Sequence, residues 1–124
     1  MAKENLVFII DDDLMQNEIH SLLLNKMYPN IFVKTFTTAA EALRAIDNQE
    51  IPETIFLDLH IPGENETHFL KEYYKRGLTS EIYLMSSMDY IDKQGLFSTY
   101  PAIIDFICKP LLDHKMKSIF KPQI

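Results

Sequence analysis

Three consecutive aspartates directly follow a short apolar segment near the start of the chain. The apolar segment is Leu6–Ile10, and the acidic residues are Asp11, Asp12 and Asp13. An uninterrupted apolar run of this length is typical of a buried strand. Carboxylates crowded at the end of such a strand oppose one another's ionisation. A hard cation such as Mg²⁺, which prefers carboxylate oxygens, would explain the arrangement. The alternative is a solvated acidic turn.

Polar residues also stand at the ends of later apolar segments. They are Asp58, Ser86, Ser87 and Lys109. A carboxylate can attack phosphorus to form an acyl phosphate, and a bound metal can neutralise phosphoryl oxygens. A lysine ammonium and a serine hydroxyl can bind the oxygens that the metal leaves free, because phosphoryl transfer mainly requires positioning and charge stabilisation. Each residue alone has an ordinary structural explanation, but together they predict phosphoryl-transfer chemistry.

Strand-like and helix-like segments alternate along the chain. The predicted strands are Asn5–Ile10, Ile31–Phe36, Thr54–Leu59, Glu81–Ser86 and Ala102–Cys108. Alternation of this kind indicates right-handed βαβ crossovers and a parallel sheet covered by helices on both faces. Ligands of such sheets bind beyond the carboxyl ends of the strands. The polar residues named above all follow strand ends, so we expect them at one edge of the sheet.

Five helices are expected between and after these strands. The first carries Met15, Ile19, Leu23 and Met27 at four-residue spacing, which is typical of one apolar helix face. The second opens with the capping-box pattern from Thr38 to Glu41. The other three are Asn65–Arg76, which turns Phe69, Leu70 and Tyr73 inward and stops at Gly77, then Asp89–Ser98, and a last helix marked by Leu112, Met116, Ile119 and Phe120. His20, in the first helix, is expected to be solvated.

Size and composition limit the possible functions. The 124 residues, 47% hydrophobic and 24% charged, predict a single globular domain over residues 1–124. A formal charge of -6 argues against direct binding to nucleic acid or anionic membrane. No apolar run is long enough to span a bilayer or to serve as a signal peptide. Cys108 is the single cysteine, which favours a cytoplasmic setting.

The chain resembles the receiver domains of bacterial response regulators over nearly its whole length. The motifs that carry the resemblance are Phe8–Asp13, Ile55–Gly63, Tyr83–Ser87 and Phe106–Pro110. The resemblance implies an α/β, flavodoxin-like, doubly wound five-stranded parallel sheet in the order 2-1-3-4-5 with five helices. It also implies a signalling switch of a two-component or phosphorelay system, not an enzyme in the usual sense, although such a domain catalyses its own phosphoryl transfer and dephosphorylation.

The same resemblance implies a role for each site residue. Asp58 would be the phosphoacceptor, and Lys109 and Ser86 would contact the phosphoryl group, with Ser87 as the alternative to Ser86. Asp11, Asp12, Asp58 and the backbone carbonyl of His60 would bind Mg²⁺, with Asp11 acting largely through metal-bound water. Phe106 matches the aromatic switch position that turns inward when Ser86 moves.

The implied partners are a sensor histidine kinase or a histidine phosphotransfer protein as donor. A downstream protein would bind the face formed by the fourth helix, fifth strand and fifth helix, and a homodimer is possible. Two rival functions are a haloacid-dehalogenase-like phosphatase, with Asp11 as nucleophile in the Asp11-Asp12-Asp13 segment, and a docking module that is not phosphorylated.

Overall fold

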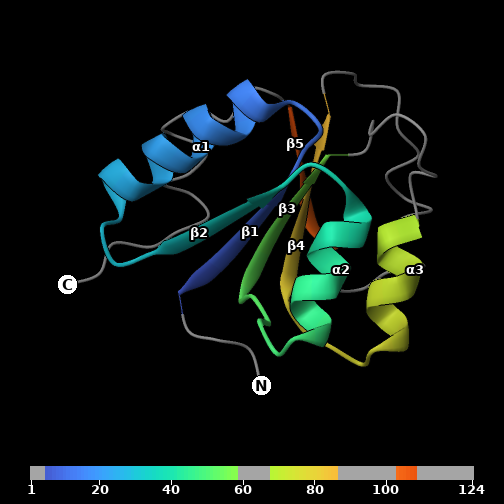
Figure 1. Cartoon of the computed structure of the whole chain (residues 1–124). Coiled ribbons are helices and arrows are strands. Elements are labelled where there is room, and N and C mark those ends of the chain that lie inside the picture. Colours follow the sequence, from blue (N-terminus) through green and yellow to red (C-terminus); the bar gives the residue numbers. More distant parts are fainter. Residues whose placement is uncertain (1–4, 59–67, 87–102, 109–124) are drawn as a thin grey trace.

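In the computed structural model, five parallel strands form one sheet in the order β2-β1-β3-β4-β5 (Figure 1). The structure describes residues 5–58, 68–86 and 103–108. The strands are β1 (Leu6–Ile10), β2 (Phe32–Phe36), β3 (Thr54–Asp58), β4 (Glu81–Ser86) and β5 (Ile103–Cys108). Each overlaps a predicted strand within one residue at either end. The parallel pairing and the strand order confirm the predicted flavodoxin-like architecture.

Helices cover both faces of the sheet. Helix α1 (Leu14–Met27) lies on one face, whereas α2 (Ala39–Asp47) and α3 (His68–Lys75) lie side by side on the other (Figure 1). Residues 65–67 of the predicted helix 65–76 lie outside the described residues, and α3 ends at Lys75, one residue before the predicted end. The predicted helix 89–98 and the last predicted helix lie outside the described residues.

Two hydrophobic layers enclose the central strands. On the α2 and α3 face, the side chains of Phe8, Ile55 and Leu84 pack beneath the helices, and on the α1 face Ile9 and Phe56 do so. Every residue of β1 and β3 is buried. Burial on both faces explains why these strands lack polar alternation. It also fixes their register, because a slip by one residue would exchange the two layers.

Side chains at the helix ends define where the described helices start and stop. Asp13 caps α1, because its carboxylate accepts hydrogen bonds from the backbone N–H groups of Met15 and Gln16. Thr38 caps α2 by accepting from the Glu41 N–H at 3.2 Å, as the capping-box pattern predicts. Gly77 follows α3 with a φ of 66°, a left-handed conformation that favours glycine. This confirms Gly77 as the predicted stop.

The orientation of α1 about its own axis differs from the one that its apolar spacing suggests. Leu23 and Met27 pack against the α1-side core, but Met15 is 71% exposed and Ile19 is 53% exposed. The positions that face the sheet instead include His20, which is 1% exposed. The prediction of a solvated His20 is therefore wrong, and the apolar face is correct only over its C-terminal half.

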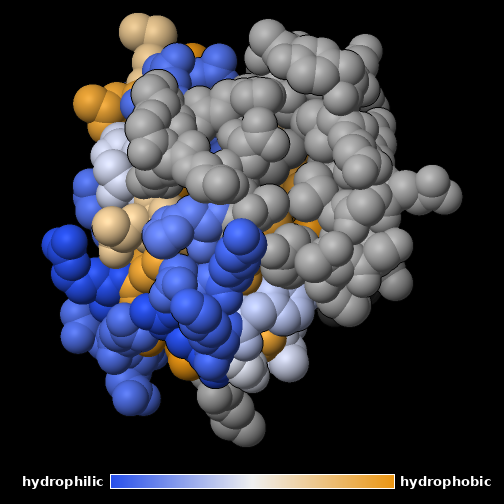
Figure 2. All heavy atoms as spheres, turned by 90° about the vertical axis from the view of Figure 1, so that its right-hand side faces the viewer, coloured by the Kyte–Doolittle hydropathy of each residue, from blue (hydrophilic) through white to orange (hydrophobic). Residues whose placement is uncertain are grey.

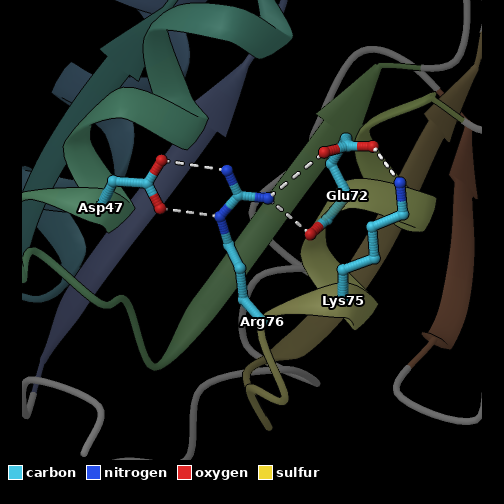
Figure 3. Close-up of polar contacts among 4 residues, drawn as sticks. All are labelled: Asp47, Glu72, Lys75 and Arg76. Atoms are coloured by element: carbon cyan, nitrogen blue, oxygen red, sulfur yellow. Dashed lines mark hydrogen bonds and ion pairs between the residues drawn. The ribbon is translucent and has the colours of Figure 1, made fainter.

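An ion-pair network links the C-terminal ends of α2 and α3. The Arg76 guanidinium donates to both carboxylate oxygens of Asp47, at 2.8 and 3.0 Å, and lies 3.6 Å from Glu72, which also pairs with Lys75 (Figure 3). The bond from Arg76 holds the pKa of Asp47 below its ordinary value. The described residues on the side of the molecule seen in Figure 2 are mostly hydrophilic, with apolar residues visible between them.

A buried hydrogen-bonded corner lies where α3 leads into β4. The Tyr73 hydroxyl accepts a hydrogen bond from the backbone N–H of Ser80, and the Ser80 hydroxyl donates to the Pro52 carbonyl at 2.6 Å. Tyr73 and Ser80 are both buried. Burial raises the pKa of the Tyr73 phenol, so the folded state favours its neutral form.

The first prediction concerns this corner. Tyr73→Phe should lower the free energy of unfolding by about 1–3 kcal/mol, because the Ser80 N–H would be left buried without its acceptor. Urea unfolding at neutral pH measures the loss. The wild type should also lose stability as the pH rises from the ordinary pKa of tyrosine through the raised pKa of folded Tyr73, and the variant should lose less. Equal stability at neutral pH and equal alkaline losses would contradict this role.

Candidate metal and phosphoacceptor site

Adjacent strands bring the two most buried site residues together. In the parallel pairing of β1 with β3, Ile10 lies opposite Leu57, so the residues that follow them, Asp11 and Asp58, emerge at the same edge of the sheet. The backbone N–H of Asp11 donates to the Phe36 carbonyl of β2 at 2.9 Å. The backbone at Asp11 is therefore held by the sheet.

Three carboxylates form a compact cluster at this edge. One oxygen from each of Asp11, Asp12 and Asp58 lies within 4.8 Å of the other two. Asp11 is 0% exposed and Asp58 is 5% exposed, whereas Asp12 is exposed. The sequence prediction that residues from separate segments meet here is thus fulfilled for these three.

The donor set suits a hard divalent cation. All three ligating groups are carboxylate oxygens, which Mg²⁺ prefers, and the exposed position of Asp12 gives the cluster access to the waters that Mg²⁺ retains. A cation between the carboxylates would offset their mutual repulsion. The residues present therefore fit the magnesium ion that the sequence predicts.

Asp13 belongs to the helix cap and not to the cluster. Its backbone N–H donates to Asp11 Oδ1 at 3.0 Å, while its own Oδ1 accepts from Met15 at 3.0 Å and Gln16 at 3.2 Å. Asp13 is the third residue of the Asp11-Asp12-Asp13 segment on which the rival phosphatase prediction rests, and its carboxylate is engaged in capping α1.

The remaining predicted site residues fall on neighbouring strands or outside the described chain. Ser86 is the last residue of β4, one position after Met85, which pairs with Asp58. Phe106 lies in β5 opposite Leu84. The backbone order thus carries Ser86 to the same edge as Asp58. His60, Ser87 and Lys109 lie outside the described residues.

The sequence reasoning missed one residue at this edge, Asn17. Its side chain is buried, and its amide nitrogen donates to the backbone carbonyl of Asp11 at 2.8 Å and toward that of Phe36 at 3.4 Å. Burying an amide without hydrogen bonds costs about 2–7 kcal/mol in transfer experiments. The only sequence signal was its place four residues after the helix cap, where a helix returns to face its own N-terminal turn.

Comparison with known proteins identifies the family. The family model of the response regulator receiver domain matches residues 7–121. The chain belongs to this family, whose members are signalling modules of two-component systems. Receiver domains bind Mg²⁺ in an acidic pocket, and the cluster of Asp11, Asp12 and Asp58 corresponds to such a pocket.

Individual relatives agree with this assignment. The chain is 25% identical over 121 residues to a probable C4-dicarboxylate response regulator, DctR, of Halalkalibacterium halodurans, covering 95% of this chain and 51% of the relative. It therefore spans about half the length of that protein. A CheY-like receiver domain protein from Methanospirillum hungatei is 20% identical, with a TM-score of 0.77 over 94% of this chain and 90% of the other.

Two further solved structures show the same fold. A two-component response regulator from Cytophaga hutchinsonii is 18% identical, with a TM-score of 0.80 over 92% of each chain. The BeF3-activated N-terminal receiver domain of Klebsiella pneumoniae RstA is 19% identical, with a TM-score of 0.74 over 93% of this chain and 94% of the other.

Among the described helices, none is long and apolar enough to cross a membrane.

The second prediction tests repulsion within the cluster. Asp12→Asn should raise the free energy of unfolding of the metal-free protein by roughly 0.5–1 kcal/mol, the scale of an exposed charge interaction. The reason is that it removes one of three crowded negative charges. Urea unfolding with EDTA at neutral pH and low salt measures the change.

Asp47→Asn is the matched control for this substitution. It also neutralises an exposed aspartate, but it breaks the pair with Arg76, so stability should fall. Adding Mg²⁺ should stabilise the wild type more than Asp12→Asn, because a ligand bound only to the folded state shifts the unfolding equilibrium. A loss of stability in metal-free Asp12→Asn as large as that in Asp47→Asn would contradict the prediction.

Proposed function

We propose that the chain is a phosphorylation switch in which Asp58 accepts a phosphoryl group with the help of Mg²⁺ held by Asp11, Asp12 and Asp58. The observation that carries the proposal is the meeting of these three carboxylates within 4.8 Å at the carboxyl edge of a receiver-domain sheet. Of the three, Asp58 alone ends the central strand β3, with β1 on one side and β4 on the other.

The proposed transfer requires one bond to form and one to break. An Asp58 carboxylate oxygen attacks phosphorus, and the bond from phosphorus to the donor's nitrogen or oxygen breaks, leaving an acyl phosphate on Asp58. Bound Mg²⁺ would neutralise charge on the phosphoryl oxygens. The burial of Asp11 and Asp58 keeps competing solvent contacts few, so the carboxylates stay oriented toward the reacting group.

Other residues complete this proposal on the strength of the family resemblance. Lys109 would pair with the phosphoryl group, and the His60 carbonyl would be a further metal ligand. Ser86 would bond a phosphoryl oxygen, and Phe106 would turn inward as it does so. The backbone position of Ser86 beside the Asp58 strand supports its part of the proposal. The change would shift an existing two-state equilibrium.

The third prediction tests the acceptor. Asp58→Asn should abolish labelling by acetyl phosphate with Mg²⁺, because an amide cannot serve as the nucleophile. Intact-protein mass spectrometry, with hydroxylamine sensitivity as the signature of an acyl phosphate, measures the label. EDTA should also prevent labelling of the wild type.

Asp47→Asn serves as the control, because Asp47 lies on α2 outside the cluster, and it should be labelled as the wild type is. Persistent labelling of Asp58→Asn would disprove the assignment. A wild type that takes no label and binds no Mg²⁺ would instead favour a docking module that is not phosphorylated.

We further propose that the donor, a histidine kinase or histidine phosphotransfer protein, docks on α1. Four of the six exposed large hydrophobic residues in the described chain lie on this helix, namely Leu14, Met15, Ile19 and Leu22. Met15, Ile19 and Leu22 are spaced four and three residues apart, which places them on one side of the helix. Contiguous exposed apolar surface marks protein interaction sites. Since α1 begins directly after Asp13, its first turn adjoins the acidic cluster, and a donor bound there would bring its phosphohistidine to Asp58.

The fourth prediction tests this surface. Leu22→Glu should slow phosphotransfer from the cognate phosphorylated donor by at least about tenfold, as expected for loss of a central apolar contact. Labelling by acetyl phosphate should not change, because a small donor needs no docking surface. Donors can be found by testing the purified histidine kinases and phosphotransfer proteins of the same genome.

Phe32→Glu is the matched control, because Phe32 and Leu22 are both 64% exposed but Phe32 lies on β2. Its transfer rate should equal that of the wild type. Equal effects of the two substitutions would disprove docking on α1. The output partner, and a possible homodimer, would use the face formed by the fourth helix, β5 and the fifth helix, of which the structure describes β5.

A further inference from the structure

We infer that Asn17 is a positioning residue of the acidic site, an inference that rests on the proposed function. Asn17 is 2% exposed and lies in α1, four residues after the cap residue Asp13. Its side-chain amide nitrogen donates to the Asp11 carbonyl at 2.8 Å and toward the Phe36 carbonyl at 3.4 Å. A single side chain thus bonds the ends of β1 and β2 to the first turns of α1.

These bonds hold Asp11 from several directions. Its N–H donates to Phe36 at 2.9 Å, its carbonyl accepts from Asn17, and its Oδ1 accepts from the Asp13 N–H at 3.0 Å. Asp13 is itself fixed, because its carbonyl accepts from the Asn17 N–H at 3.0 Å. This backbone bond starts α1 and does not depend on the residue type at position 17, so the specific contribution of Asn17 is its side-chain bond to the Asp11 carbonyl.

The chemistry of the two partners explains why an amide is needed. Both are carbonyl oxygens, which only accept hydrogen bonds, and the NH2 group of Asn17 has two N–H donors for them. The orientation of the amide is therefore fixed. Among the described residues, Asn17 Oδ1 has no hydrogen-bond partner. The side chain is therefore held by its donors alone. Aspartate, with the same shape, would turn a carboxylate toward two carbonyls and add charge beside the cluster.

The consequence concerns the metal more than the fold. Groups that orient metal ligands through hydrogen bonds typically change metal affinity by about 10–100-fold when they are removed. Asn17 contacts the backbone of a proposed ligand, so we expect an effect at the lower end of this range. A purely structural role would lower stability but leave the Mg²⁺ affinity of the folded protein unchanged.

The test compares Asn17→Leu and Asn17→Ala with Leu24→Ala. Leucine has a branched side chain like that of asparagine but cannot donate a hydrogen bond, and alanine tests whether the larger leucine side chain itself causes the effect. Leu24→Ala is the control for a general loss of packing, because Leu24 is a fully buried residue of the same helix. Titration calorimetry with Mg²⁺, at a temperature where circular dichroism shows each variant folded, gives the dissociation constant. Nuclear magnetic resonance gives hydrogen exchange at the Asp11 and Asp13 amides.

Both Asn17 variants should raise the Mg²⁺ dissociation constant by about tenfold and speed exchange at the two amides, whereas Leu24→Ala should leave the constant unchanged. A wild-type constant in Asn17→Leu, or an equal rise in Leu24→Ala, would overturn the inference. If the wild type binds no Mg²⁺, the proposed function fails. The hydrogen-exchange rates of the Asp11 and Asp13 amides then test on their own whether Asn17 positions Asp11. Faster exchange only in the Asn17 variants would then support it, and unchanged exchange would overturn it.

Discussion

Close packing of negative charge at the carboxyl edge of the sheet is the constraint on which the rest of the site depends. Asp11 and Asp58 follow or end two adjacent central strands whose residues are all buried. The carboxylates cannot move apart without disturbing the register, because both hydrophobic layers depend on it. The fold thus concentrates negative charge at this edge, and a bound cation would offset it. This is the physical basis for the proposal of a metal-dependent reaction at this edge.

Helix α1 departs from the usual arrangement of polar residues outside and apolar residues inside. It buries Asn17 and His20 against the sheet while Met15 and Leu22 remain exposed. Such local departures are expected at functional sites, where stability is given up for another purpose. The buried amide of Asn17 donates to the Asp11 carbonyl, and the exposed apolar residues form the proposed docking surface. The orientation of α1 about its own axis thus accounts for both features.

The other face of the sheet follows simpler rules. Helix α3 buries the predicted Phe69, Leu70 and Tyr73. An ion pair between Asp47 of α2 and Arg76, which directly follows α3, joins the two helices. The buried Tyr73 and Ser80 fix the approach to β4. This side contributes a rigid support for β3 and β4, whose ends carry Asp58 and Ser86. The relative from Halalkalibacterium halodurans is about twice as long, and the similarity covers only about half of it.

Much of the architecture was determined by the sequence alone. Apolar runs and turn residues act locally, so the strands, the Thr38 cap and the Gly77 stop were predicted where the structure has them. The meeting of Asp11, Asp12 and Asp58 also followed, because parallel strands end at one edge, although the strand order came from family resemblance. The rotation of α1 could not be predicted, because its apolar residues outline more than one face. Only the tertiary structure decided it, through long-range bonds from Asn17 to the ends of two strands and the Asp13 cap that sets the first turn.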